Sequence, residues 1–493
     1  MGRAFEFQAL NAFHFAVIGP LGTVAVAAAG AFGSTPAVAH AQEPLSPALL
    51  AQVRDLQDGP RNRALSMKIL TSLTTEVGPR LAGTEAEARA RAWALRTMKE
   101  LGLENVRVET TPIDVWVRGE ESARVVAPFP QPLVVSGLGG TVATPKDGIE
   151  AEVVRFETLA ALERAEPQTV KGKIVFIDRP MPKTQDGSGY GTVVGIRARG
   201  AVKAARLGAR AVLIRSVGTD SHRLPHTGMM RYAEGVERIP AAALSAPDAD
   251  QLTRILERSD APVQVALLLR SRFPGPATTG NVIGEIPGRT RPEEVVLIGA
   301  HLDSWDLGTG AVDDGSGVAI VLATAKRILE EKLAPARTVR VVLFGGEEVG
   351  LVGAKAYAKA HQEELERHVV AMESDFGAGP VYRLSARVGQ FDAVRQLAEP
   401  LARLKVVLGD NEGHGGPDLV PMRDFAVPML HLEQDGRDYF DVHHTADDTL
   451  DKVDPDGLAQ NVSVWATVVW AVASTPVDFR SRAGRGGEAD VSP

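Results

Sequence analysis

Cysteine is absent from this sequence of 493 residues, which excludes disulfide bridges, thiolate metal ligands and cysteine nucleophiles. Charge of one sign is not strongly in excess either, since the net charge is −8 and long runs of like charge do not occur. Neither nucleic acid nor an anionic membrane surface is therefore expected as a partner. Beyond the N-terminal region, no stretch approaches the roughly 20 apolar residues that a membrane-spanning helix needs.

The N-terminal residues 1–41 have the pattern of an export signal. The run Phe15–Phe32 is apolar and rich in small residues, and the tripeptide A-H-A at 39–41 is typical of a cleavage site. The charged start is weak because Glu6 offsets Arg3, so a disordered extension, a misassigned start or a retained anchor are the alternatives. We expect an exported protein, periplasmic or secreted, that is free of the membrane once the signal is removed.

The rest of the chain divides by its pattern into four parts. Residues 42–122 have helical spacing followed by an extended stretch, and residues 123–273 are short strands and turns around one expected helix, 195–207. Strands alternate with helices again over 274–476, which predicts an α/β sheet with helices on both faces. The β-rich segment 123–273 is far longer than an ordinary loop, so we expect an inserted domain. The polar, Gly-rich tail 477–493 is expected to be disordered.

Histidine and carboxylate side chains follow three predicted strands, 295–298, 339–344 and 369–372, at the edge where chemistry sits in such sheets. A fourth cluster lies in the segment YFDVHHTADDT. The side chains are His301, Asp303, Asp313 and Asp314 after the first strand, Glu347 and Glu348 after the second, Glu373 and Asp375 after the third, and His443 and His444 in the last segment.

These residue types predict a metal site. Zinc takes imidazole nitrogen and carboxylate oxygen, and two zinc ions roughly 3.5–4 Å apart can clamp an attacking water and a peptide carbonyl. Such a pair needs a carboxylate that bridges the metals and a free carboxylate that acts as base. Adjacent acids at the end of an apolar strand, as at Glu347 and Glu348, also cost desolvation energy unless a cation is bound. Cobalt or manganese could occupy the same set.

The motifs GAHLDSW, GAVDDGSG, FGGEEVG, MESD and HHTADDT together resemble the co-catalytic dizinc exopeptidases of the aminopeptidase type. The resemblance extends over about 46–476. Within it, VKGKIVFIDRP, GAVKAARLGARAVLIRSVGT and IPAAALSAPDADQL resemble an inserted protease-associated domain. It implies a mixed, mostly parallel sheet, a homodimer, and the hydrolysis of dipeptides or short peptides.

The same resemblance implies a role for each site residue. His301 would bind one zinc ion, Asp313 would bridge two, Glu348 and Asp375 would bind terminally, and His444 would complete the second site. Glu347 would be the general base, and Asp303 would orient the imidazole of His301.

Two of these assignments have neighbouring alternatives. Asp314 competes with Asp313, whose spacing from His301 fits the family pattern better. His443 competes with His444, which directly precedes the T-x-x-D-T run as the family's ligand does.

Two further stretches contain candidates for contact with the substrate. His226, Arg231 and Tyr232 in LPHTGMMRY could reach over the cleft, or this stretch could be a plain surface loop. His414 in the Gly-rich NEGHGGPD could shape a pocket.

Two other functions share this fold. A glutaminyl cyclase-like acyltransferase would use a single zinc ion, and a non-catalytic binding protein of the transferrin receptor type would have lost its metal ligands. The complete ligand set argues against both, and the insert argues against the acyltransferase as well. The number of bound metal ions discriminates the three functions.

Overall fold

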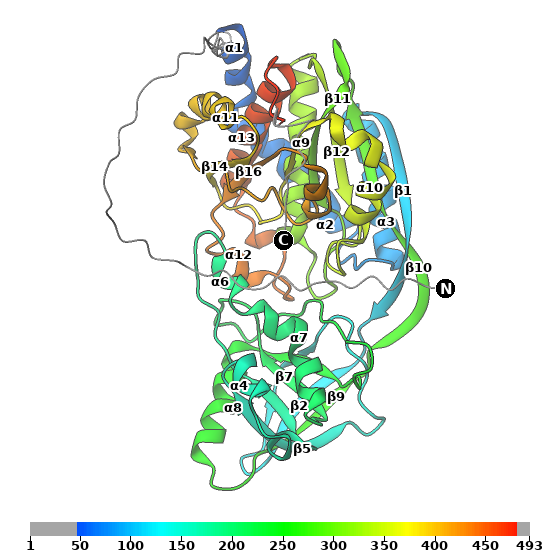
Figure 1. Ribbon diagram of the computed structural model, residues 1–493, viewed down its shortest axis with the longest axis vertical. Coiled ribbons are helices and arrows are strands. Elements are labelled where there is room, and N and C mark those ends of the chain that lie inside the picture. The colour runs from blue at the N-terminus through cyan, green and yellow to red at the C-terminus, as the bar shows by residue number, and fades with distance from the viewer. Residues whose placement is uncertain (1–46, 481–493) are drawn as a thin grey trace, which may run out of the picture. The chain divides into compact units, whose positions relative to one another are not determined.

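The first of two sheets forms the platform of the site. The structure is a computed structural model that describes residues 47–480, so the predicted signal at 1–41 lies outside the described residues (Figure 1). In sheet order, the strands are β1 (Glu104–Val117), β10 (Arg272–Ile286), β12 (Arg337–Phe344), β11 (Arg291–His301), β13 (His368–Glu373), β16 (Met429–Gln434), β14 (Val381–Arg387) and β15 (Val407–Leu408). The central strands β12, β11, β13 and β16 are parallel, while β1, β10 and β14 pair antiparallel. The predicted mixed sheet is confirmed.

Both faces of this sheet are covered, because successive apolar residues of its strands point to opposite faces and each face packs against helices. On β11, Val296 and Ile298 pack into the core that contains α9 (Ser316–Glu330) and α13 (Pro455–Ser474). Val295 and Leu297 point to the opposite face, where they share a core with α10 (Val352–Ala360). Period-two alternation within an apolar run produces this two-sided burial.

Three helices precede the first strand, as the helical spacing predicts. They are α1 (Pro47–Leu56), α2 (Gly59–Glu76) and α3 (Glu85–Leu101). The side chains of Asp58 and Thr84 cap α2 and α3 by accepting backbone N–H groups of the first turn. Gly102 ends α3 with a φ of 97°, a left-handed conformation that favours glycine.

The second sheet is built mainly from the segment predicted to be an insert. In order, its strands are β3 (Gln131–Leu133), β2 (Glu121–Ala127), β9 (Gln264–Leu269), β5 (Ile149–Phe156), β6 (Ile174–Ile177), β7 (Ala211–Arg215), β8 (Ala241–Leu244) and β4 (Val135–Gly137). Helix α7 (Val194–Arg206) covers one face and α8 (Ala246–Arg258) covers the other. Shorter helices are α4 (Leu159–Glu163), α5 (Pro167–Val170) and α6 (Ser188–Gly191).

This segment differs from its prediction in one respect and leaves another open. Helix α8 is a second long helix, which the pattern missed because few apolar residues, among them Leu252 and Ile255, mark its buried side. The described residues 47–480 fall in one unit, which does not divide at either end of 123–273. The largest core also contains residues of both sheets, such as Ile177 and Ile298. A separate protease-associated domain is therefore not shown and stays a prediction.

Several helical elements of the C-terminal part are short. Helix α11 (Phe391–Ala398) gives way to a 3-10 turn at Glu399–Leu404, because Pro400 cannot continue an α-helix. The other 3-10 turns are Gln362–Arg367, Val420–Phe425 and Leu450–Lys452, and α12 spans Tyr439–Val442.

The start of the predicted disordered tail is packed. Phe479 is buried, and Arg480 pairs with Glu294 at 3.0 Å. Residues 481–493 lie outside the described part. Within residues 47–480, no helix combines the length and apolar character needed to cross a membrane.

Candidate metal centre

Parallel strands bring the predicted ligands to one edge of the first sheet. His301 is the last residue of β11, Glu347 and Glu348 follow the turn after β12, and Asp375 lies two residues beyond β13. The carboxyl ends of neighbouring parallel strands meet at the same edge. Three stretches far apart in the sequence therefore converge.

Asp313 and Asp314 lie in an irregular turn, Ala311–Gly315, that separates their roles. Asp314 accepts the backbone N–H of His301 and that of Gly317, each at 3.0 Å. Asp313 instead directs its carboxylate into the site, and Asp448 anchors the turn by accepting the N–H groups of Val312 and Asp313. Asp314 thus supports the backbone, and Asp313 is the residue of the two whose carboxylate can bind a metal ion.

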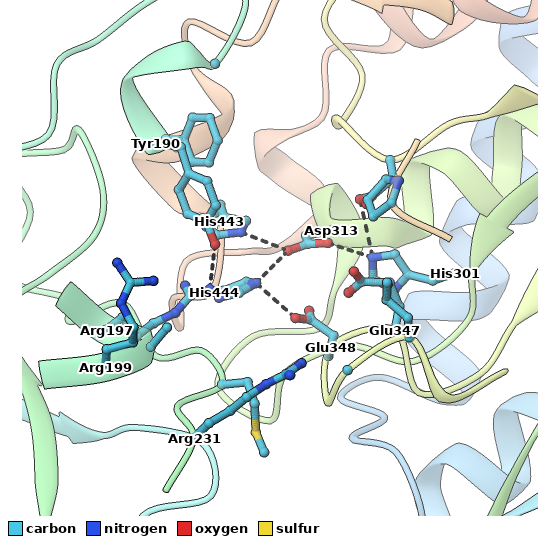
Figure 2. Close-up of a pocket in the computed structure, with 18 of the residues that line it drawn as sticks. Tyr190, Arg197, Arg199, Arg231, His301, Asp313, Glu347, Glu348, His443 and His444 are labelled. Atoms are coloured by element: carbon cyan, nitrogen blue, oxygen red, sulfur yellow. Dashed lines mark hydrogen bonds and ion pairs between the residues drawn. The ribbon is translucent and has the colours of Figure 1, made fainter. Parts of the chain in front are cut away.

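Asp313 stands between two groups of potential ligands (Figure 2). Its Oδ1 atom lies 3.0 Å from Nε2 of His301, which lies 3.4 Å from Oδ1 of Asp375. Its Oδ2 atom lies 3.3 Å from Nε2 of His444, which lies 3.0 Å from Oε2 of Glu348. One carboxylate that serves two donor groups is the arrangement a bridged pair of metal ions requires.

His443 lies close to the same carboxylate. Its Nε2 atom is 3.6 Å from Oδ2 of Asp313, and its ring stacks on that of His444 with centroids 3.5 Å apart. Burial lowers the pKa of His443 well below its ordinary value, so the ring is neutral. The shorter distance to Asp313 and the contact with Glu348 favour His444 as the ligand of the pair.

A loop of the second sheet's segment contacts His444 on the side of the ring that faces away from Asp313. The backbone N–H of Thr227 donates to the carbonyl of His444 at 3.0 Å, and Nδ1 of His444 lies 3.3 Å from the carbonyl oxygen of Thr227. The hydroxyl of Thr227 donates to Gly137 and accepts from Arg118. These contacts fix the ring so that Nε2 faces Asp313. Thr227 lies in LPHTGMMRY, where the sequence drew attention to its neighbours, and no local signal pointed to Arg118.

Asp303 contacts His301 through its backbone carbonyl and not through its carboxylate. The Nδ1 atom of His301 lies 2.9 Å from the backbone carbonyl oxygen of Asp303 and 3.9 Å from the carboxylate Oδ1. That Oδ1 accepts the backbone N–H groups of Gly346 and Glu347, at 2.8 and 3.1 Å. The carbonyl therefore orients the imidazole, whereas the carboxylate holds the turn that carries Glu347.

The carboxylate of Glu347 borders the cavity and makes no hydrogen bond or ion pair with another residue of the described range 47–480. Burial raises its pKa well above the ordinary value; His301 opposes the increase, and the nearby charges of Asp375 and Glu348 add to it. Such a free, partly buried carboxylate is suited to proton transfer.

The charges of this cluster fit a bound cation. Burial raises the pKa of Glu348, and repulsion from Asp313 raises it further. Burial alone would raise the pKa of Asp313 too, but hydrogen bonds with His301 and His444 hold it well below its ordinary value. Within the described residues, Oε1 of Glu348 is buried without a hydrogen-bond partner. Crowded carboxylates with an unpaired oxygen are stabilised by a metal ion that takes oxygen and imidazole ligands.

A cavity of about 980 Å³ opens onto these residues, and three of the four predicted substrate contacts, Arg231, Tyr232 and His414, line it. His414 does so with its ring 3.9 Å from that of His431. Tyr232 also does so, but its hydroxyl already donates to the carbonyl of Ile239. His226 does not line the cavity; its Nε2 is bonded to Asp220 and the residue is 1% exposed. It belongs to the packing behind His443, because the loop turns it inward.

Known proteins resemble this chain over most of its length. Residues 281–469 match the family model described as Peptidase family M28. Carboxypeptidase Q of Bos taurus is 37% identical over 414 residues, which cover 83% of this chain and 85% of that protein. The crystal structure of a peptidase M28 precursor from Shewanella amazonensis is 49% identical, with a TM-score of 0.86, and covers 88% of this chain and 98% of that one.

A zinc aminopeptidase from Bacillus subtilis has a TM-score of 0.60 at 21% identity, over 85% of this chain and 97% of that one, a likeness that shows the fold alone. The identity to carboxypeptidase Q, by contrast, extends over most of both chains. The predicted resemblance to exopeptidases is confirmed at this level: the chain belongs to peptidase family M28.

Proposed function

We propose that this protein is an exopeptidase that hydrolyses dipeptides or short peptides with two zinc ions. The observation that carries the proposal is Asp313, whose two oxygens face two donor groups, beside the unbonded carboxylate of Glu347. The name of carboxypeptidase Q and the zinc named for the Bacillus subtilis aminopeptidase support the same chemistry. Cobalt or manganese would suit the same ligands.

Each zinc ion would have its own terminal ligands. His301 and Asp375 would hold one ion, Glu348 and His444 would hold the other, and Asp313 would bridge them. When bound, the two ions would polarise the peptide carbonyl and lower the pKa of water at the site.

Residues of the chain would carry out the proton transfer. Glu347 would accept a proton from the attacking water and deliver it to the departing amine, which the free position of its carboxylate allows. Asp303 would keep Glu347 in place through the backbone N–H bonds of the turn. Buried His301 would keep its Nε2 directed at the site because its Nδ1–H donates to the carbonyl of Asp303.

The two rival functions make different demands. A single-zinc acyltransferase would need only one of the two donor groups, and a binding protein would need neither. The proximity of His301 to Asp375 and of His444 to Glu348 supports two groups, and membership of a peptidase family favours hydrolysis.

The test is metal content measured together with hydrolysis of a dipeptide panel, for the wild type and Glu347→Gln. We expect close to two metal ions per chain in both, with kcat reduced roughly 100- to 10,000-fold in the variant, the range for loss of a general base. Glu363→Gln, on an exposed turn, is a matched control that removes the same charge. Retained activity in Glu347→Gln, or a wild type that binds no metal, would refute the proposal.

Export and the identity of the insert are proposed with it. The apolar run and the A-H-A tripeptide near the N-terminus support cleavage before Gln42. N-terminal sequencing of the mature protein would test this, and an intact Met1 would refute it. The assignment of the insert as a protease-associated domain is supported by sequence resemblance. The same resemblance supports a homodimer, which the mass of the protein in solution would test.

A further inference from the structure

The walls of the cavity carry opposite charges. Donor residues of the metal centre line one side, and the positive side chains that line the cavity come from residues 197–231 of the other segment. These are Arg197, Arg199, Lys203, Arg206 and Arg231. Lys203 is paired with Glu163 at 2.6 Å. The four arginines have no carboxylate partner within the described range 47–480, so this wall presents uncompensated positive charge.

Arg231 is the arginine of this wall that is placed to meet a ligand at the metal centre. Figure 2 shows its side chain extending toward Glu348, whereas Arg199 turns away. The guanidinium of Arg231 has neither a hydrogen bond nor an ion pair to any described residue. The Nη2 atom of Arg231 lies 3.3 Å from the position that a Cβ atom of residue 350 would occupy. Residue 350 is a glycine with a φ of 121°, a conformation that favours glycine, and its lack of a side chain leaves space for the guanidinium.

Arg197 adds a second positive charge to the same wall. This residue is 8% exposed, its Nη2 donates to the hydroxyl of Tyr190, and its Nη1 lies 3.4 Å from Nδ1 of His444. A buried arginine without a carboxylate strengthens the attraction for an anion in the cavity, because burial reduces screening by water.

We propose that Arg231 binds the free α-carboxylate of the peptide substrate. This inference rests on the proposed function and adds which end of the peptide is recognised. A guanidinium presents paired N–H donors that match the two oxygens of a carboxylate. Because Arg231 extends toward Glu348, itself a donor of the metal centre, the carboxylate belongs to the residue directly after the scissile bond. The enzyme therefore releases one C-terminal residue at a time and accepts dipeptides as its shortest substrates.

The test compares a dipeptide with its C-terminal amide on the zinc-loaded enzyme. The wild type is expected to favour the free acid roughly 10- to 100-fold in kcat/KM, the effect of a hydrogen bond to a charged group, with most of it in KM. In Arg231→Gln this preference should disappear because only the acid loses rate, and Arg231→Lys should restore part of it. Arg199→Gln removes the same charge from the same cavity but should keep the preference.

Each outcome decides the inference. Equal use of acid and amide by the wild type, or a preference that survives in Arg231→Gln, would overturn the role of Arg231 while the peptidase activity itself stands. Equal loss of preference in Arg199→Gln would show a general effect of positive charge and would also overturn it. If zinc-loaded wild type hydrolyses neither compound, the proposed function fails and this inference fails with it.

Discussion

Asp303→Asn separates two roles that one residue could play. The carboxylate Oδ1 accepts two backbone N–H groups, from Gly346 and Glu347, while the main-chain carbonyl accepts from His301. Asparagine keeps the main chain and one acceptor oxygen but removes the charge. The substitution therefore weakens the support of Glu347 and leaves the orientation of His301 unchanged.

The size of the effect follows from these two hydrogen bonds. A hydrogen bond to a charged acceptor contributes about 1 kcal/mol more than one to a neutral acceptor, so the turn loses roughly 2 kcal/mol of support. If this loss appears in the positioning of the base, kcat falls roughly 30-fold. The new amide NH2 would also replace Oδ2, a buried atom with no hydrogen-bond partner among the described residues, so thermal stability should fall.

The assay is steady-state hydrolysis of a dipeptide beside a zinc titration of the purified variant. We expect kcat to fall, KM to change little, and both zinc ions to bind with wild-type affinity. The opposite pattern would be a zinc affinity reduced roughly 10- to 100-fold, the usual cost of losing a residue that orients a ligand. That result would show that the carboxylate, 3.9 Å from Nδ1 of His301, supports the imidazole after all.

Two further predictions concern residues outside the donor set. Gly228→Ala should remove the zinc ion on the His444 side while the other is retained. A Cβ at Gly228 would lie 2.7 Å from Nδ1 of His444 and would also clash with Nη1 of Arg197, so zinc content should fall from two to one per chain. Gly235→Ala is the matched control, since Gly235 also has a positive φ, 72°, but nothing within 4 Å, and unchanged zinc content in both variants would contradict the prediction. Burial lowers the pKa of His368 to about 4, so the folded protein keeps this histidine neutral where the unfolded chain is protonated, and stability is lost as the pH falls from about 6.5 toward 4. Urea unfolding at pH 7 and pH 5 should show roughly 2 kcal/mol more loss for the wild type than for His368→Gln, and equal losses would refute the assignment.

Local pattern was sufficient for the elements that carry the donors. The apolar runs that became β11, β12 and β13 are recognisable because strands buried on both faces are continuously apolar. Polar residues directly after them had to lie at one edge of the sheet. Helix ends were less predictable, and α11 stops at Ala398 because of Pro400. The short apolar stripe of α8 was too weak a signal to separate it from loop.

The local pattern was not sufficient to decide between neighbouring residues. Asp313 and Asp314 are the same residue type at adjacent positions. The irregular turn at Ala311–Gly315 decides which of the two carboxylates enters the site. The residue types at 301 and 303 do not indicate that the backbone carbonyl of Asp303, and not its carboxylate, contacts the imidazole of His301. His226 looked available in a loop, yet its pairing with Asp220 turns it inward. A backbone conformation of this kind depends on hydrogen bonds to distant segments.

The sequence by itself determined that candidate donors follow the strand ends, because alternation, strand length and residue chemistry are local properties. Only the tertiary structure placed Thr227 against His444, and Arg231 on the wall facing the metal centre. Thr227 and His444 are far apart in the sequence, and no periodicity links them. Their contact exists because the second sheet packs its loops against the edge of the first, and packing of that kind depends on the whole chain.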